Sequence, residues 1–466
     1  MNQVTRTFVL VGLTVVILLA MHFLPTLYIK DVELRRVNVL SDILPEVYRE
    51  RDAIDVIPSV PMPKMADNVD NSAAAGSGAQ ADANACAQDS TAGDSLPSRY
   101  AVRTSSAILD FSEGAPGGMG HFYHALDNIS SLGRPLRIAY YGDSFIEGDV
   151  MTCDLREMLQ ARYGGNGVGW VDCVDKLNGF RRTVKVKSHA LSAHEVVEKP
   201  FLHSLEGISQ RYFGVSEGAS LSVSSTGYKS HASSWQTATL YMRAQGGMSV
   251  VHNGDSVYVS PSQSVQTIVT PSRGKRSVDY RFSSVSGVNH LFGVAMESNG
   301  GVILDNFSMR GSAGFTLANI PDPTLADFAR LRPYDLIIIH FGLNVASDKA
   351  HAANYKAYIR RMQQAIEHLR KAYPEASVLV VSIPDRDQRT DAGIMTMKGV
   401  ESLVAYQQIL AANCHVSFFN LFNAMGGRES MKVLVEKGWA NKDYAHLSFR
   451  GGRYMAEIIF KALTES

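Results

Sequence analysis

The first run of hydrophobic positions extends from Phe8 to Ile29, with only two threonines, one histidine and one proline among its 22 residues. At 1.5 Å of rise per residue, a helix of this length reaches about 33 Å, slightly more than the roughly 30 Å hydrocarbon core of a bilayer. The run therefore predicts a transmembrane anchor within residues 1–31. A cleaved signal peptide is the alternative, although the run is longer than the usual apolar region and no clean Ala-x-Ala site follows it.

The pattern changes sharply after the anchor. Residues 32–56 mix charged and apolar positions, which suggests a short helix that Pro45 would interrupt. Residues 71–94 include 9 alanines and contain no leucine, isoleucine, valine or aromatic residue. Such a segment buries too little apolar surface to offset its ordering entropy. We therefore expect residues 32–97 to form a juxtamembrane segment followed by a disordered linker.

Continuous apolar runs of strand length mark the two ends of the remaining chain. They lie at Leu136–Tyr141, Asp335–Phe341 and Val378–Ser382, and helical spacing of apolar residues separates the last two. Runs of this kind are typical of parallel strands buried on both faces of a sheet. The pattern predicts one α/β domain built from residues 98–184 and 304–466.

Between these two parts, short strand candidates alternate with turns rich in serine, glycine and threonine. The candidates are Ser220–Ser224, Thr237–Arg243, Met248–His252, Ser256–Val259, Val265–Val269, Ser277–Phe282 and Asn289–Glu297. Regular spacing of short strands indicates a β-sandwich. We expect this β domain, residues 185–303, to be inserted between the first and second strand–helix units of the α/β domain.

Composition narrows the classes of function. The 45 Lys+Arg residues balance the 45 Asp+Glu residues, so no net positive charge favours nucleic acid as a partner. The 4 cysteines and 14 histidines show no metal-ligand spacing, so neither a metal nor a cofactor is expected. Cys153 and Cys173 are 20 residues apart, and two alternatives stay open for them: a disulfide in an oxidising compartment or two buried free thiols.

Two motifs carry a nucleophile and a base. Gly142-Asp143-Ser144 follows the first predicted strand directly, where ligand sites of open α/β sheets lie. Asp443 and His446 stand in an Asp-x-x-His loop just before the last predicted helix. A serine needs a histidine base, and a carboxylate holds that histidine in the right tautomer. Taken singly, each motif is also compatible with a turn serine or with an unrelated surface pair.

A third motif supplies candidate oxyanion donors. Gly342-Leu343-Asn344 ends the strand at Asp335–Phe341, and the Asn344 amide can donate to a developing oxyanion. Gly311 can place a backbone N–H beside it, although Gly314 is a near competitor. The simpler interpretation of Asn344 is a residue that closes a turn.

The order of these motifs along residues 132–184 and 305–466 resembles the SGNH (GDSL-like) hydrolase superfamily. The resemblance implies a three-layer, flavodoxin-like fold and metal-free ester chemistry. It also implies that Ser144 is the nucleophile, His446 the base and Asp443 its orienting carboxylate. The oxyanion hole would then consist of Ser144, Gly311 and Asn344. The family often has aspartate after the asparagine, where this chain has Val345.

A narrower resemblance extends over residues 142–170, which are similar to the opening of bacterial peptidoglycan O-acetylesterases. Those enzymes also carry a carbohydrate-binding-like β insertion. The expected function is therefore removal of O-acetyl groups from an envelope glycan such as peptidoglycan. Here Phe145-Ile146-Glu147 replaces the residues usual after the serine, which affects the expected specificity. Trp235 and Tyr241 in the insert could stack on sugar rings or fill the sandwich core.

Two other functions stay open. One is an O-acetyltransferase that moves acetyl from a membrane donor to an envelope glycan, with a membrane acyltransferase as a possible partner, and the other is a non-catalytic glycan-binding protein. Positive residues flank the predicted anchor on both sides, namely Arg6 before it and Lys30, Arg35 and Arg36 after it. The charge pattern therefore does not set the orientation. We expect an extracytoplasmic, periplasmic catalytic domain because the resemblance is to envelope enzymes.

Overall fold

The computed structural model describes residues 28–29, 32–33, 107–347 and 352–465. Its contacts divide the chain into two units, Met1–Ala87 and Gln88–Ser466. In the first unit, β1 (Tyr28–Ile29) pairs antiparallel with β2 (Val32–Glu33), so the start of the expected helix at 32–56 is extended instead. The rest of the predicted anchor and the linker lies outside the described residues. None of the helices in the described ranges has the length and apolarity to cross a bilayer.

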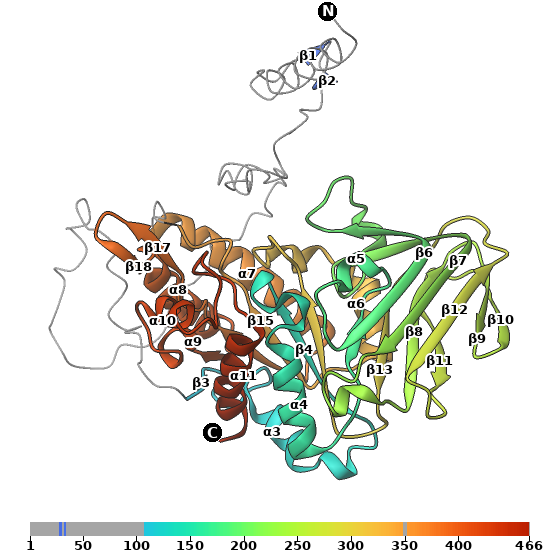
Figure 1. The fold of residues 1–466 in the computed structure, drawn as a ribbon, viewed down its shortest axis with the longest axis horizontal. Helices are drawn as coiled ribbons and strands as arrows, with labels where there is room; N and C mark the ends of the chain where they lie inside the picture. The colour runs from blue at the N-terminus through green and yellow to red at the C-terminus, as the bar shows by residue number, and fades with distance from the viewer. Residues whose placement is uncertain (1–27, 30–31, 34–106, 348–351, 466) are drawn as a thin grey trace, which may run out of the picture. The chain divides into compact units, whose positions relative to one another are not determined.

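A six-stranded sheet forms the centre of the second unit (Figure 1). Its strands, in spatial order, are β14 (Val302–Ser308), β4 (Leu136–Gly142), β15 (Leu336–His340), β16 (Ser377–Val381), β19 (Ser417–Phe419) and β3 (Leu109–Asp110). All neighbours are parallel except β3, which runs antiparallel to β19. Every residue of β4, β15 and β16 is buried, as their continuous apolar runs predict.

Helices pack around this sheet in two groups. Helix α4 contacts α11, beside which it lies in Figure 1, and α7 contacts both α6 and α8. The α-helices are α3 (Gly120–Asp127), α4 (Thr152–Tyr163), α5 (Asp175–Asn178), α6 (Asp322–Leu331), α7 (Ala352–Ala372), α8 (Gly399–Asn413), α9 (Leu421–Ala424), α10 (Ser430–Glu436) and α11 (Phe449–Thr464). Short 3₁₀ helices lie at η2 (Ile129–Ser131), η3 (Ser144–Asp149), η4 (His203–Leu205), η5 (His231–Ser233) and η6 (Phe315–Asn319).

The β-rich part of the chain forms a second sheet, which is antiparallel and nine-stranded. Its strands are β5 (Gly169–Val171), β6 (Val184–Glu195), β7 (Arg211–Ser225), β8 (Thr237–Ala244), β9 (Met248–His252), β10 (Asp255–Val259), β11 (Gln266–Pro271), β12 (Ser277–Ser283) and β13 (Asn289–Glu297). The first half of β7 pairs with β13 and its second half with β12. The long strand β7 therefore links two groups of strands into one continuous sheet.

In part of this second sheet, one face is buried and the other is exposed to solvent. Residues of β12 alternate between buried and exposed, with Val278, Tyr280 and Phe282 facing the interior. Trp235 and Tyr241 are both buried, so they are core residues and are not free to stack on a ligand. A separate two-stranded hairpin, β17 (Asp387–Thr390) with β18 (Gly393–Thr396), projects from the α/β part.

The antiparallel sheet contributes side chains to the hydrophobic core of the α/β part and has a second core of its own. Strand β5 belongs to the antiparallel sheet through its pairing with β13, although it precedes the expected insert in sequence. Trp170 on β5 packs edge-on against Phe307 of β14, and Tyr241 of β8 stacks on Phe328 of α6 at 5.5 Å. These aromatic contacts make the antiparallel sheet continuous with the α/β core.

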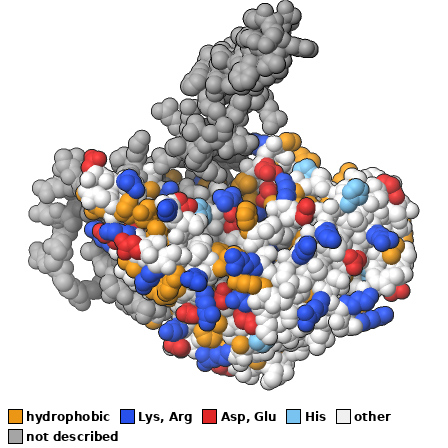
Figure 2. All heavy atoms as spheres, in the orientation of Figure 1, with side chains coloured by type: hydrophobic (Ala, Val, Ile, Leu, Met, Phe, Trp, Pro, Cys, Tyr) orange, Lys and Arg blue, Asp and Glu red, His pale blue; other side chains and the backbone are white. Residues whose placement is uncertain are grey.

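Charges of both signs are interspersed over the face of the molecule shown in Figure 2. This surface agrees with the balanced composition and offers no extended basic stripe on that face. Beneath the surface, Cys153 and Cys173 are buried free thiols. Burial raises the pKa of both thiols, which keeps them protonated and unreactive.

Candidate active site

The predicted nucleophile lies at the carboxyl end of β4, in the interior of the parallel sheet. Strand β4 ends at Gly142, and a Cβ added there would lie 2.9 Å from the backbone oxygen of His340 on β15. Glycine therefore allows the two strands to approach at this point. After Asp143 the chain turns into η3, whose first residue is Ser144. Ser144 is 8% exposed, so its hydroxyl is partly shielded from water.

The predicted base lies within hydrogen-bond distance of this serine. His446 Nε2 is 2.8 Å from Ser144 Oγ, although the two residues are 302 positions apart in the sequence. The loop that carries His446 is closed by a hydrogen bond from Asn441 N–H to the His446 carbonyl oxygen, at 2.7 Å. It ends at Ser448, which accepts a hydrogen bond from Gly451 N–H and caps α11. Local hydrogen bonds thus hold the base in place.

Asp443 completes the chain of contacts. Its Oδ2 lies 2.8 Å from His446 Nδ1, and its Oδ1 accepts hydrogen bonds from Ala445 N–H and His446 N–H at 3.0 Å each. Burial raises the pKa of Asp443, but hydrogen bonds from His446 and Ala445 outweigh it and lower the pKa to about 2. An ionised Asp443 favours a proton on Nδ1, which leaves Nε2 free to accept the serine proton.

The candidate oxyanion donors come from two loops that the structure joins. Asn344 Nδ2 donates to the Ser312 carbonyl oxygen at 2.9 Å, and its amide carries a second hydrogen for another acceptor. Gly311 lies one residue before Ser312 with φ +78° and an exposed backbone. Ser144 is the first residue of η3, so its N–H has no partner inside that helix.

Gly314, the competing glycine, has a different structural role. Its N–H donates to Ser312 Oγ at 3.0 Å, and a Cβ added there would lie 2.6 Å from the Phe341 ring. Its backbone donor is thus engaged, and its missing side chain makes room for Phe341. Gly311 is the better candidate for the oxyanion hole.

One residue of the candidate site escaped the sequence analysis although it stands inside the first motif. Asp143 Oδ1 accepts a hydrogen bond from Phe145 N–H, and its Oδ2 accepts two more from Gly342 N–H and Leu343 N–H. The carboxylate is buried, which raises its pKa to about 6 despite these hydrogen bonds. Asp143 therefore joins the nucleophile loop to the loop that carries Asn344. The sequence signal that could have revealed this role is that Asp143 directly precedes Ser144.

A second pair that the motifs did not reveal lies across the same loops. Glu147, three residues after Ser144, forms an ion pair with Arg310 at 2.9 Å, and Arg310 precedes Gly311 directly. Both side chains are partly exposed, so the pair contributes little to stability. The pair does place charged groups beside the candidate oxyanion loop. Glu147 belongs to Phe145-Ile146-Glu147, the segment where this chain departs from the expected pattern.

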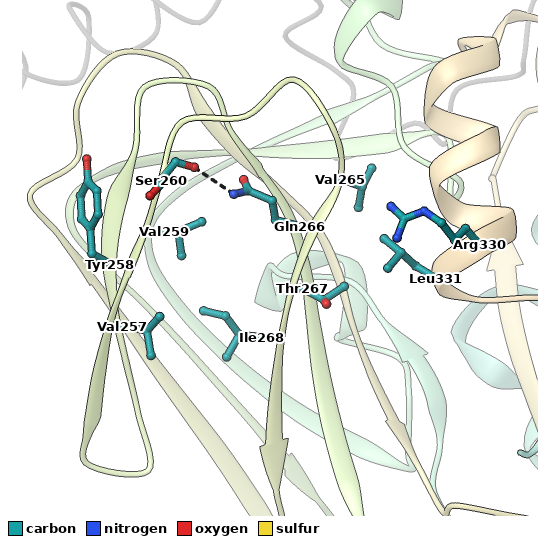
Figure 3. Close-up of a pocket in the computed structure, with 10 residues that line it drawn as sticks. All are labelled: Val257, Tyr258, Val259, Ser260, Val265, Gln266, Thr267, Ile268, Arg330 and Leu331. Atoms are coloured by element: carbon teal, nitrogen blue, oxygen red, sulfur yellow. Dashed lines mark hydrogen bonds between the residues drawn. The ribbon is translucent and has the colours of Figure 1, made fainter.

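A shallow hollow of about 450 Å³ lies elsewhere, between β10, β11 and the end of α6 (Figure 3). Its lining consists of Val257, Tyr258, Val259, Ser260, Val265, Gln266, Thr267, Ile268, Arg330 and Leu331. The lining contains no carboxylate, histidine or thiol that could supply acid–base or nucleophilic chemistry. In the described part of the chain, no cluster of three histidine, cysteine, aspartate or glutamate residues could hold a metal ion.

Comparison with solved structures places this geometry in a known fold. A structure of a peptidoglycan O-acetylesterase matches 77% of this chain and 98% of its own, with 20% sequence identity and a TM-score of 0.64. The described chain has the fold of that esterase. This likeness confirms, at the level of the fold, the resemblance that the motifs predict.

Other comparisons add little. A family two carbohydrate esterase from Cellvibrio japonicus is 12% identical over 60% of this chain and 98% of its own, with a TM-score of 0.24. A protein from Bacillus subtilis is 12% identical over 59% of this chain and 88% of its own, with a TM-score of 0.29. TM-scores this low support no argument. No family model matches the sequence, and no curated protein matches it either.

Proposed function

We propose that this protein is a serine esterase that removes O-acetyl groups from a cell-envelope carbohydrate such as peptidoglycan. The observation that carries the proposal is the continuous chain of contacts from Ser144 Oγ through His446 to Asp443, with 2.8 Å at each link. A nucleophile, a base and an orienting carboxylate in this geometry are the requirements for acyl transfer through serine. The fold shared with a peptidoglycan O-acetylesterase supports the choice of substrate.

The geometry suggests the following sequence of steps. Ser144 Oγ attacks the acetyl carbonyl carbon while His446 Nε2 takes the serine proton, and Asp443 stabilises the resulting imidazolium. Donors on Ser144, Gly311 and Asn344 would bind the oxyanion. His446 then gives its proton to the departing sugar oxygen, which leaves acetyl-serine. Water, deprotonated by the same histidine, releases acetate and restores the serine.

The proposal includes a location. The apolar run Phe8–Ile29 is long enough to anchor the chain in a membrane, and residues 71–94 have the composition of a tether. We propose that the catalytic part lies outside the cytoplasm, on the periplasmic side, because an envelope glycan is there. Protease accessibility of the catalytic part in intact spheroplasts tests this placement, and complete protection of the chain would contradict it.

Acetate release by the purified full-length chain tests the reaction. The substrates are O-acetylated peptidoglycan and a small aryl acetate, each with and without a free sugar as acceptor. We expect release from the wild type and a loss of at least about 10³-fold in Ser144→Ala. Ser283→Ala, an exposed serine at the end of β12, is the matched control and should retain full activity.

The other results are equally informative. Acetyl groups that appear on the free sugar in place of acetate would make the protein a transferase. Normal turnover by a folded Ser144→Ala variant would remove Ser144 from the mechanism. A wild type that releases no acetate from either substrate would contradict the proposed esterase.

A further inference from the structure

The segment Gly179–Thr183, between α5 and β6, presents an aromatic side chain to solvent beside the candidate active site. Phe180 is 75% exposed, the largest value for any large hydrophobic residue in the described part of the chain. Burial of a phenylalanine side chain is favourable because it removes apolar surface from water. Single exposed apolar residues are common on protein surfaces, so exposure alone assigns no role to Phe180.

The exposed Phe180 side chain suggests a role because of where it lies relative to the candidate nucleophile. Gly148 lies four residues after Ser144, within η3, and has φ +65°. A Cβ added to Gly148 would lie 2.9 Å from the Cβ of Phe180. The base of the phenylalanine side chain thus packs against the turn that immediately follows the nucleophile.

A buried ionic network fixes the segment to that turn. Asp149 is buried and accepts hydrogen bonds from both terminal nitrogens of Arg156 at 2.9 Å. Thr183 Oγ1 donates to the same carboxylate at 3.0 Å, and Arg181 Nη2 lies 3.4 Å from it. Burial raises the pKa of Asp149, but the charges of Arg156 and Arg181 outweigh it and keep the carboxylate ionised. Arg181 and Thr183, which follow Phe180, are therefore held in place.

The same segment reaches the start of α11, which directly follows the loop that carries His446. The Arg182 guanidinium lies 4.0 Å from the centre of the Phe449 ring and 5.6 Å from the centre of the Tyr228 ring. Phe449 follows His446 by three residues, and Tyr228 belongs to the antiparallel sheet domain, just after β7. One five-residue segment therefore contacts η3, which begins at Ser144, and the first residue of α11, three positions after His446.

We propose that Phe180 is a stacking platform for a pyranose ring of the acetylated glycan, next to the ring that carries the reacting acetyl group. This inference rests on the proposed function and names the part of the substrate that is recognised. The C–H face of a pyranose is apolar, and its hydrogens complement the negative face of an aromatic ring. Phenylalanine has only two side-chain torsions, so it loses little conformational entropy when a ligand stacks on it. The Arg182 guanidinium lies beside the Phe449 and Tyr228 rings, and guanidinium N–H groups are suited to sugar hydroxyls.

A comparison of two substrates tests the platform in the full-length protein. Soluble O-acetylated glycan fragments of six or more sugars would engage Phe180, whereas a small aryl acetate would not. We expect Phe180→Ala to raise KM for the fragments roughly 3- to 10-fold and to leave kcat, and all constants for the aryl ester, within twofold of the wild type. Phe180→Trp should restore the KM. Tyr258→Ala is the matched control, since Tyr258 is 59% exposed in the hollow of Figure 3. This variant should leave KM and kcat for both substrates unchanged.

Three results would overturn the platform. They are an unchanged KM for the fragments in Phe180→Ala, an equal loss on both substrates, and failure of Phe180→Trp to restore binding. If the wild type releases no acetate at all, the proposed function fails separately. Calorimetric binding of the same fragments to Ser144→Ala and to Ser144→Ala/Phe180→Ala then decides the platform without turnover: weaker binding by the double variant supports it, and equal binding contradicts it.

Discussion

The carboxylate of Asp143 accepts a hydrogen bond from the backbone N–H of Leu343, with 3.1 Å between Oδ2 and the nitrogen. The two residues lie at the ends of neighbouring parallel strands, β4 and β15, and each precedes a candidate catalytic residue: Ser144 in one loop and Asn344 in the other. A buried carboxylate that binds both loops fixes the distance between the candidate nucleophile and the candidate oxyanion donor. Asp143 is therefore a positioning residue of the site.

Asp143→Asn should weaken this connection. The asparagine side chain has only one oxygen. At least one of the backbone N–H groups of Phe145, Gly342 and Leu343 would therefore face its NH₂ group and lose its acceptor. We expect a loss of about 1–3 kcal/mol in the free energy of unfolding and a fall in kcat of roughly 10- to 100-fold on the small ester. Urea denaturation and steady-state kinetics measure the two effects. Wild-type kcat in a destabilised variant would show that Asp143 supports the fold alone.

Asn344→Ala removes the side-chain donor of the proposed oxyanion hole. Loss of one such donor typically lowers kcat by about 10²- to 10³-fold, because the donor acts on the transition state more than on the bound substrate. We expect KM for the aryl acetate to stay within about threefold. Asn423→Ala is the matched control, since Asn423 lies on α9, away from the motif residues in sequence. A kcat within twofold of the wild type would exclude Asn344 as a donor.

Asp443→Asn tests the orienting carboxylate. The pKa of about 2 means that Asp443 is ionised above about pH 4, so the wild type has this anion beside His446 throughout the neutral range. The amide can stabilise the wrong tautomer of the histidine, and we expect kcat to fall on the order of 10³-fold. The side chain is about half exposed, so the free energy of unfolding should change by less than about 1 kcal/mol. A loss of kcat smaller than tenfold would indicate a minor role.

A buried pair of carboxylates, Asp385 and Asp387, predicts a pH-dependent stability. Asp385 Oδ2 accepts a hydrogen bond from Met431 N–H at 3.0 Å, and Thr396 Oγ1 lies within hydrogen-bond distance of both Asp385 and Asp387. Burial and the charge of Asp387 raise the pKa of Asp385 from 3.8 to about 7. Between about pH 4 and pH 7 the folded protein thus holds a proton that the unfolded chain has released. Its free energy of unfolding must fall as pH rises through that window.

Asp385→Asn, which resembles the protonated carboxyl, should remove this dependence. We expect the free energy of unfolding of the wild type to drop by roughly 2 kcal/mol more than that of the variant between pH 5 and pH 8. Chemical denaturation at both pH values measures the difference. Asp255→Asn, an exposed residue on β10, is the control and should follow the wild type. Identical slopes for wild type and Asp385→Asn would contradict the prediction.

Many of the strands and several candidate site residues could be predicted from the sequence, because the signals for them depend on residues that are neighbours in the chain. Continuous apolar runs predicted β4, β15 and β16, since a strand buried on both faces needs apolar residues at every position. The short strands of the antiparallel sheet were visible for a related reason, because turn residues separate them. Ser144 and Asn344 could be proposed as site residues because each follows such a strand, where parallel sheets place their ligand sites.

The sequence could not reveal which residues that are distant along the chain lie in contact. The 2.8 Å contact between Ser144 and His446 joins residues 302 positions apart, and the packing of α11 against α4 is one of the tertiary contacts near it. Gly311 and Gly314 look alike in the sequence, and the contact of Gly314 with Phe341 is what separates their roles. The sequence by itself determined which strands exist and which residue types follow them, because secondary structure and motif order depend on neighbours in the chain. The tertiary structure alone decided which distant groups meet, that Trp235 and Tyr241 are core, and that Phe180 is exposed beside the nucleophile, because burial and contact depend on how the sheets and helices pack.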